Sequence, residues 1–237
     1  MANNFESLPI GVFDSGIGGL NVLKSLYLNF ENENFVYLGD NKNAPYGNKS
    51  LKKVKQLSTQ SIQRLIDYGV KAIVIACNTV STNFYKYLKS KYTLPIIPTV
   101  PPIIVDDNAV LACTTNTAKS TFVKTYYKGR VLAFSSLAKT IENNIFNLDK
   151  VNVKKIFSKL NKDTDTLILG CTHYSFLQQK IERELRVKCI DGYNLISNAL
   201  KKSVNLNEPV RLVSKNRIDF IGNHNEFNRE IFNKLLL

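Results

Sequence analysis

Two short stretches of the 237-residue chain share one order of residue types, and they constrain the fold more than any other feature. Residues 74–79 read Val-Ile-Ala-Cys-Asn-Thr, and residues 167–173 read Leu-Ile-Leu-Gly-Cys-Thr-His. An apolar run of this length is typical of a buried strand. Each strand therefore delivers one thiol, Cys77 or Cys171, followed by side chains that can hydrogen-bond a ligand. Two thiols presented in the same way indicate one site with a sulfur on each side.

The rest of the chain alternates between strand and helix patterns. Strands are predicted at residues 10–13, 35–38, 71–76, 109–113, 130–134, 166–169, 187–190 and 217–221. Helices are predicted at residues 20–28, 51–68, 82–91, 118–127, 137–160 with a break near 147–151, 176–186, 195–203 and 226–236. Strands that alternate with helices predict mostly parallel sheets flanked by helices, so the predicted fold class is α/β.

The two halves of the chain repeat one pattern of strand, helix, strand, helix and strand, with a cysteine after the third strand. The proline-rich segment 94–102 between them indicates a crossing between domains. We therefore predict two pseudo-symmetric domains: residues 1–97 with 206–237, which carry Cys77, and residues 98–205, which carry Cys171. Because parallel sheets bind ligands at the carboxyl ends of their strands, the active site is expected in the cleft between the domains.

A glycine loop, Gly-Ile-Gly-Gly at 16–19, follows the first strand and opens a helix. Asn21 breaks the dinucleotide pattern G-x-G-x-x-G, and no Gly-Lys-Ser/Thr follows, so a nucleotide site is not expected. The loop amides can instead hold a small anion at a helix N-terminus. Asp14, just before the loop, is either a helix cap or a carboxylate that contacts an ammonium group or orients a thiol.

The chain is basic, with 32 Lys and Arg against 19 Asp and Glu and a net charge of +13. A charge of this size fits nucleic acid or an anionic substrate as partner. The basic residues are dispersed, however, and the densest stretches, 52–55 and 86–91, have helical spacing. This pattern favours solvated helix faces over a nucleic-acid site.

The four cysteines match no zinc-binding spacing and include no Cys-x-x-Cys pair, so we expect free thiols and no metal. Cys189, within an apolar run, fits a small core residue. No apolar run reaches the roughly 18 residues of a membrane span, and residues 1–8 lack the apolar block of a secretory signal. We expect a cytoplasmic protein with no membrane partner.

The neighbours of the two thiols indicate their chemistry. A helix N-terminus favours the thiolate; Asn78, Thr79 and Thr172 supply donors suited to a carboxylate, and His173 exchanges protons near neutral pH. A Cys-His hydrolase needs only one nucleophile, and a peroxidase-like pair needs one attacking and one resolving thiol. Neither explains the similar polar neighbours of both thiols. Inversion of a carbon that bears a hydrogen does, because it needs a base on one face and an acid on the other.

Four segments resemble, in the same order, motifs of the cofactor-independent aspartate/glutamate racemase family, and most strongly its glutamate racemases. They are Phe-Asp-Ser-Gly-Ile-Gly-Gly at 13–19, Gly-Asp with Pro-Tyr-Gly within 39–47, Ala-Cys-Asn-Thr at 76–79 and Gly-Cys-Thr-His-Tyr at 170–174. The resemblance implies two facing α/β domains that interconvert L- and D-glutamate without pyridoxal phosphate or another cofactor. It also implies that D-glutamate feeds peptidoglycan synthesis and that the protein is a homodimer.

The same resemblance implies roles for particular residues. Cys77 would deprotonate the D-isomer and Cys171 the L-isomer, with Asp14 and His173 assisting the respective thiols. The residues implied to contact substrate are Asp14, Ser15, Tyr46, Gly47, Asn78, Thr79, Thr117, Thr172 and His173.

Some positions depart from the family pattern: Ser175 replaces a proline, Asn116 replaces a glycine, and 135–142 matches loosely. Three alternatives stay open. The substrate could be another small amino acid, such as aspartate. The basic surface could bind nucleic acid or DNA gyrase, which some family members inhibit. A thiol hydrolase would require an acyl pocket beside one sulfur.

Overall fold

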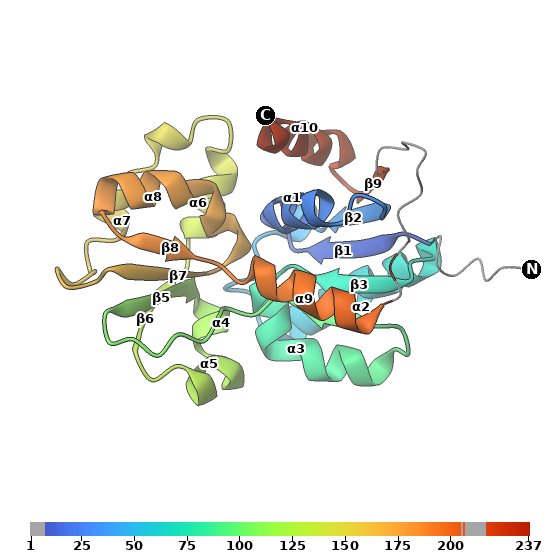
Figure 1. The fold of residues 1–237 in the computed structure, drawn as a ribbon, viewed down its shortest axis with the longest axis horizontal. Helices are drawn as coiled ribbons and strands as arrows, with labels where there is room; N and C mark the ends of the chain where they lie inside the picture. The colour runs from blue at the N-terminus through green and yellow to red at the C-terminus, as the bar shows by residue number, and fades with distance from the viewer. Residues whose placement is uncertain (1–7, 205, 207–216) are drawn as a thin grey trace, which may run out of the picture.

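The chain forms two parallel β-sheets, one in each half of the molecule, with helices packed on their faces (Figure 1). The computed structural model describes residues 8–204, 206 and 217–237. The signal-peptide prediction for residues 1–8 and part of the segment 206–237 therefore lie outside the described residues. Within the described part, every neighbouring pair of strands is parallel, which confirms the predicted α/β class.

The first sheet has the strand order β4-β3-β1-β2-β9, and the second has the order β6-β5-β7-β8. The first consists of β1 (Ile10–Asp14), β2 (Phe35–Gly39), β3 (Ala72–Ile75), β4 (Ile96–Pro98) and β9 (Ile218–Gly222). The second consists of β5 (Ala109–Thr114), β6 (Arg130–Phe134), β7 (Thr166–Gly170) and β8 (Lys188–Ile190). The order β2-β1-β3-β4 in one sheet corresponds to β6-β5-β7-β8 in the other, as an internal duplication would produce.

Helices separate the strands along the chain. Those attached to the first sheet are α1 (Gly19–Asn29), α2 (Leu51–Tyr68), α3 (Asn78–Lys91) and α10 (Asn225–Leu236), with the short 3₁₀ helix η1 (Asn41–Asn43). Between β5 and β8 lie α4 (Thr115–Ala118), α5 (Thr121–Tyr126), α6 (Leu137–Asn143), η2 (Leu148–Lys150), α7 (Val153–Ile156), η3 (Thr172–Leu177) and α8 (Gln178–Leu185). Each sheet separates two apolar clusters, so both of its faces are buried.

Several predicted element limits were wrong for local reasons. Helix α3 begins at Asn78 rather than at 82, directly after Cys77. The predicted helix 118–127 is split, because Ser120 accepts a hydrogen bond from the Val123 amide and starts a new helix. The helical region 137–160, predicted with a break near 147–151, consists of three short pieces at 137–143, 148–150 and 153–156, and Asn152 caps the last of them. The proline-rich crossing contains an edge strand, β4.

The two halves are joined by two crossings, one between β4 and β5 and one between β8 and α9 (Tyr193–Ser203). The crossings touch each other at Gly192, where an added Cβ would lie 2.5 Å from the carbonyl oxygen of Val100. After its crossing, α9 packs against α1 and β4 of the first sheet. The domain limits stated above stay a prediction.

No helix in the described ranges has the length and apolar character needed to cross a membrane.

Candidate active site

Cys77 is positioned by the end of β3 and the start of α3, for which it is the N-cap residue. Its thiol donates to the Ser15 hydroxyl over 3.6 Å, and its residue is only 5% exposed. Burial raises the pKa of Cys77 to about 12, and the Asp14 carboxylate contributes in the same direction. The helix N-terminus is thus outweighed by the loss of solvent, and Cys77 is a neutral thiol at neutral pH.

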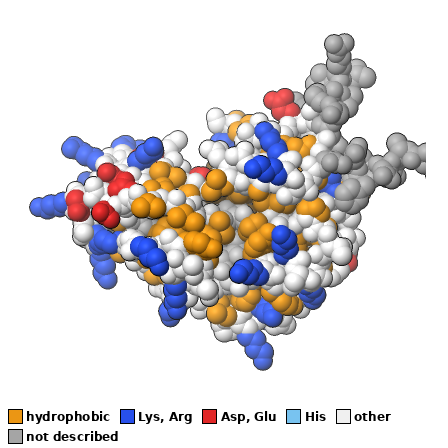
Figure 2. All heavy atoms as spheres, turned by 60° about the horizontal axis from the view of Figure 1, so that its bottom comes forward, with side chains coloured by type: hydrophobic (Ala, Val, Ile, Leu, Met, Phe, Trp, Pro, Cys, Tyr) orange, Lys and Arg blue, Asp and Glu red, His pale blue; other side chains and the backbone are white. Residues whose placement is uncertain are grey.

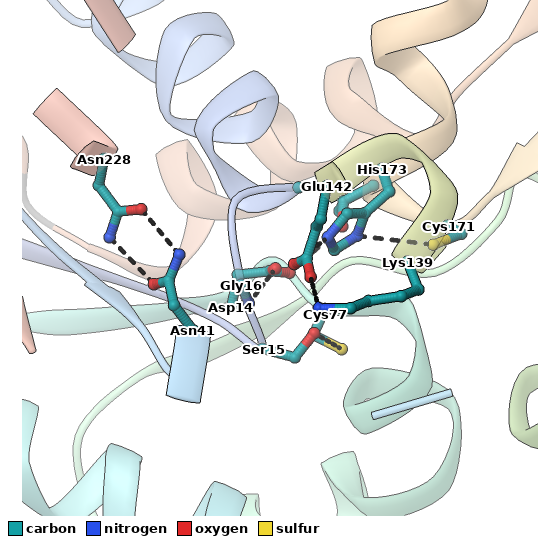
Figure 3. Close-up of polar contacts among 12 residues, drawn as sticks. Asp14, Ser15, Gly16, Asn41, Cys77, Lys139, Glu142, Cys171, His173 and Asn228 are labelled. Atoms are coloured by element: carbon teal, nitrogen blue, oxygen red, sulfur yellow. Dashed lines mark hydrogen bonds and ion pairs between the residues drawn. The ribbon is translucent and has the colours of Figure 1, made fainter. Parts of the chain in front are cut away.

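Cys171 follows β7 directly and is the N-cap residue of η3. Its sulfur lies 3.9 Å from Nδ1 of His173, whose Nε2 lies 3.0 Å from a carboxylate oxygen of Glu142 (Figure 3). Burial alone lowers the pKa of His173, but its hydrogen bonds with Cys171 and Glu142 outweigh burial and hold that pKa well above the ordinary value. A protonated His173 donates from both ring nitrogens, to the sulfur and to the carboxylate.

Asp14 ends β1 beneath the glycine loop and is fully buried. Its carboxylate accepts hydrogen bonds from the Gly16 amide at 2.9 Å and from the Thr172 hydroxyl at 3.3 Å. Burial raises the pKa of Asp14, while His173 and the loop amides oppose that shift. Asp14 therefore joins the glycine loop of the first sheet to the segment that carries the second thiol.

Both thiols line the same cavity, one from each sheet. Its lining consists of Ser15, Pro45, Tyr46, Gly47, Cys77, Asn78, Thr79, Thr114, Ala138, Cys171, Thr172 and His173. Its volume is about 10 Å³, which is room for about one water molecule. The cavity therefore has no room for an amino acid in this conformation, and its walls must move apart to admit one.

Polar side chains from both halves are already paired with one another at the cavity, Thr79 from the first half and Thr114 and Thr117 from the second. Three threonine hydroxyls form a triangle. The Thr79 oxygen lies 2.9 Å from that of Thr114 and 3.3 Å from that of Thr117, and the latter two lie 3.0 Å apart. Tyr46 donates its hydroxyl to Asp40 at 2.5 Å; burial and this bond raise the pKa of Tyr46. These contacts orient hydroxyl groups that line or adjoin the cavity.

A second contact joins the two halves beside the thiols. Gly18 approaches η3 so closely that an added Cβ would lie 2.3 Å from the Thr172 hydroxyl oxygen. The Asn21 amide group donates to the Thr172 carbonyl at 3.3 Å. Glycine in this loop is therefore explained by the close approach of the opposite half, in addition to the turn itself.

The structure places nine of the eleven predicted site residues in the cavity wall. The other two lie behind the cavity wall: Asp14 is hydrogen-bonded to the wall residue Thr172, and Thr117 to the wall residue Thr79. Thr114 and Glu142, which come from β5 and α6, were not among the predicted site residues. Glu142 lies in the loosely matching segment 135–142, where no spacing to His173 could have identified it. In the described ranges, no group of three or more His, Cys, Asp or Glu side chains is arranged to hold a metal ion.

Curated relatives match nearly the whole chain, although no protein-family profile matches it. The glutamate racemase of Clostridium novyi is 35% identical, and the match covers 96% of this chain and 95% of that protein. The glutamate racemase of Fusobacterium nucleatum is 32% identical over 84% of this chain and 82% of its own length.

Solved structures agree with these relatives. Glutamate racemase from Thermus thermophilus, in complex with β-chloro-D-alanine, superposes with a TM-score of 0.81 at 31% identity, over 97% of this chain and 93% of that one. Glutamate racemase from Francisella tularensis, in complex with D-glutamate, gives a TM-score of 0.73 at 27% identity, over 97% and 94%. The fold and the shared cavity define the class: a two-domain α/β isomerase with one thiol on each side of an enclosed site. The chain belongs to the glutamate racemase family.

Proposed function

We propose that this protein interconverts L- and D-glutamate by transfer of the Cα proton between two cysteines. The observation that carries the proposal is the position of Cys77 and Cys171, which line one small cavity from opposite sheets. One sulfur removes the proton from one face of the substrate, and the other sulfur returns a proton to the opposite face. The ligands named for the relatives from Thermus thermophilus and Francisella tularensis are single amino acids.

The two thiols have different neighbours. Burial raises the pKa of Cys77 to about 12, so Cys77 is a neutral thiol that can donate a proton. The sulfur of Cys171 lies 3.9 Å from Nδ1 of His173, whose pKa is held well above its ordinary value by its hydrogen bonds with Cys171 and Glu142. In the proposed scheme Cys171 serves the L-isomer and Cys77 the D-isomer.

A Cα proton is too weakly acidic for a thiolate to remove without help. Donors aimed at the substrate carboxylate, where negative charge develops, and exclusion of water lower the barrier. The proposed substrate-contacting set is Asp14, Ser15, Tyr46, Gly47, Asn78, Thr79, Thr117, Thr172 and His173. The Thr79, Thr114 and Thr117 hydroxyls, now paired with each other, would exchange those bonds for bonds to substrate.

The wider role follows from the product. We propose that the D-glutamate formed is used for peptidoglycan synthesis, and that the enzyme acts in the cytoplasm as a homodimer. A nucleic-acid or gyrase partner has less support, because the face in Figure 2 carries its Lys and Arg side chains singly among apolar and polar ones. No concentrated basic stripe is visible on that face.

The proposal is tested by adding L-glutamate to the purified protein without cofactor and measuring D-glutamate by chiral chromatography. We expect turnover by the native protein and its loss in both Cys77→Ala and Cys171→Ala. Cys189→Ala is the matched control: Cys189 is equally buried but lies outside the cavity wall, so its variant should keep activity. Full activity in either cavity variant would refute the two-cysteine scheme.

A further inference from the structure

Asn116, in α4 of the second half, makes three hydrogen bonds to one loop of the first half. Its side-chain amide donates to the carbonyls of Tyr46 at 3.1 Å and Lys49 at 2.8 Å. Its backbone amide donates to the carbonyl of Gly47 at 2.8 Å. A single residue thus donates to three backbone carbonyls of the loop 46–49, of which that of Tyr46 also accepts from the Lys49 amide at 3.2 Å.

The loop 46–49 is also fitted closely to the second half. An added Cβ at Gly47 would lie 2.5 Å from the Cβ of Thr114, so the loop backbone rests directly on the end of β5. Tyr46 and Gly47 both form part of the cavity wall. The bonds of Asn116 therefore hold a piece of the wall that surrounds the thiols.

Asn116 is held in place from the other side. The side-chain amide of Asn83, in α3, donates to the Asn116 carbonyl at 3.2 Å and to the Thr79 carbonyl at 2.9 Å. Because α3 begins at Asn78, directly after Cys77, and includes Thr79 and Asn83, Asn116 is bonded both to the loop and to the helix that follows the first thiol.

We propose that Asn116 is a positioning residue that holds the loop 46–49 against the second half and so keeps the site closed around Cys77 and Cys171. The cavity of about 10 Å³ is too small for any amino acid, so its walls, among them the loop 46–49, must move before substrate enters. Separation of the loop from the second half breaks the bonds of Asn116. The contacts that Asn116 makes, and their effect on access to the two thiols, do not depend on any catalytic activity. Only their consequence for turnover rests on the function proposed above.

The experiment measures how often the site opens, by the rate at which a neutral thiol reagent reaches the two cysteines. The native protein and each variant are treated with iodoacetamide without substrate, and alkylation of each cysteine is followed by peptide mass spectrometry. The main variant is Asn116→Asp, which keeps the side-chain shape but removes both side-chain donors. Asn116→Ala removes the amide without adding charge.

The matched control is Asn29→Asp, which makes the same chemical change at an exposed asparagine whose side-chain amide donates to the Ser25 carbonyl of its own helix. The buried thiols Cys113 and Cys189 are internal controls in every sample, because they lie outside the cavity wall. Circular dichroism and thermal melting verify that each variant is folded.

We expect both Asn116 variants to raise the alkylation rates of Cys77 and Cys171 together by about ten-fold, as the loss of two net hydrogen bonds predicts. Cys113, Cys189 and the Asn29→Asp protein should keep the native rates. Unchanged rates at Cys77 or Cys171 would overturn the proposal, as would an equal rise at all four cysteines, which indicates general loosening. The readout needs no racemase activity, so a failure here is distinct from a failure of the proposed function.

Discussion

Cys77 and Cys171 occur in similar sequence motifs but have different surroundings. Cys77 has a hydroxyl, Ser15, as its hydrogen-bond partner, and a buried carboxylate raises its pKa further. Cys171 has an imidazole as its neighbour, and Glu142 holds that imidazole in its charged form. The duplication therefore supplies two equivalent positions for sulfur, and the residues around each position give the two sulfurs different hydrogen-bond partners.

Buried neutral thiols should make the stability of the protein depend on alkaline pH. Burial raises the pKa of Cys77, Cys113 and Cys189 to about 12 in each case. The pKa of a cysteine thiol in the unfolded chain is about 8.5. Above that pH the unfolded chain therefore loses protons that the folded chain retains. The contribution to stability is complete below about pH 8.5 and is lost as the pH rises toward about 12.

Urea denaturation at several pH values in this range measures the effect. We expect the free energy of unfolding to fall with pH, with each thiol contributing a slope of up to about 1.4 kcal/mol per pH unit. Cys113→Ala removes one of the three thiols and should reduce the slope. A free energy that stays constant up to about pH 11 would contradict the burial of neutral thiols.

Residues adjacent to the cysteines in sequence were predictable, because they belong to the same strand-to-helix turn. Asn78, Thr79, Thr172 and His173 follow their cysteines directly and line the cavity. Glu142, Thr114 and Asn116 reach the site through folding of separate elements. No local pattern specifies that approach, so these residues required the structure.

At the scale of elements, α2 shows how local signals fix a helix. Ser50 accepts a hydrogen bond from the Lys53 amide at the N-terminus, and Val54, Leu57, Ile62 and Leu65 form its buried face. Gly69 ends the helix with φ of 92°, a left-handed conformation that suits glycine. The sequence predicted both ends of this helix correctly for these reasons.

Gly69→Ala should destabilise the protein by about 1–2 kcal/mol, the usual cost of a left-handed conformation for a residue with a Cβ. The cost is purely conformational, because an added Cβ at Gly69 meets nothing within 4 Å. Gly129→Ala is the matched control: Gly129 is also open, with no atom nearer than 3.7 Å and no positive φ. Urea denaturation that shows equal effects at both positions would contradict this account.

Shorter elements were less predictable than α2 because one capping side chain can divide them. Ser120 accepts a backbone hydrogen bond that starts a new helix inside the predicted helix 118–127, and Asn152 does the same directly after the predicted break near 147–151. Strand β4 has only three residues and ends at a proline, and its identity depends on pairing with β3. Pairing between distant segments is not visible in local sequence.

At the scale of the whole molecule, the site exists only where two similar halves meet. Several sets of contacts hold the halves together around the thiols, among them Asn116 with the loop 46–49, Thr79 with Thr114, and Thr172 with Asp14 and Asn21. The alternation of strands and helices predicted both sheets, and the paired motifs predicted where each thiol would emerge. The closed state of the cavity could not be predicted, because it depends on how the halves pack.

The central claim is that each thiol serves one face of the substrate, and isotope exchange tests it most directly. L-glutamate is incubated with the protein in deuterium oxide, and at low conversion the two isomers are separated and analysed by mass spectrometry. Two bases predict that the D-glutamate formed carries deuterium at Cα while the remaining L-glutamate carries none, because Cys77 delivers a solvent-derived deuteron and Cys171 keeps the proton it removed. A product that retains protium at Cα, or substrate that gains deuterium as fast as product forms, would contradict the account.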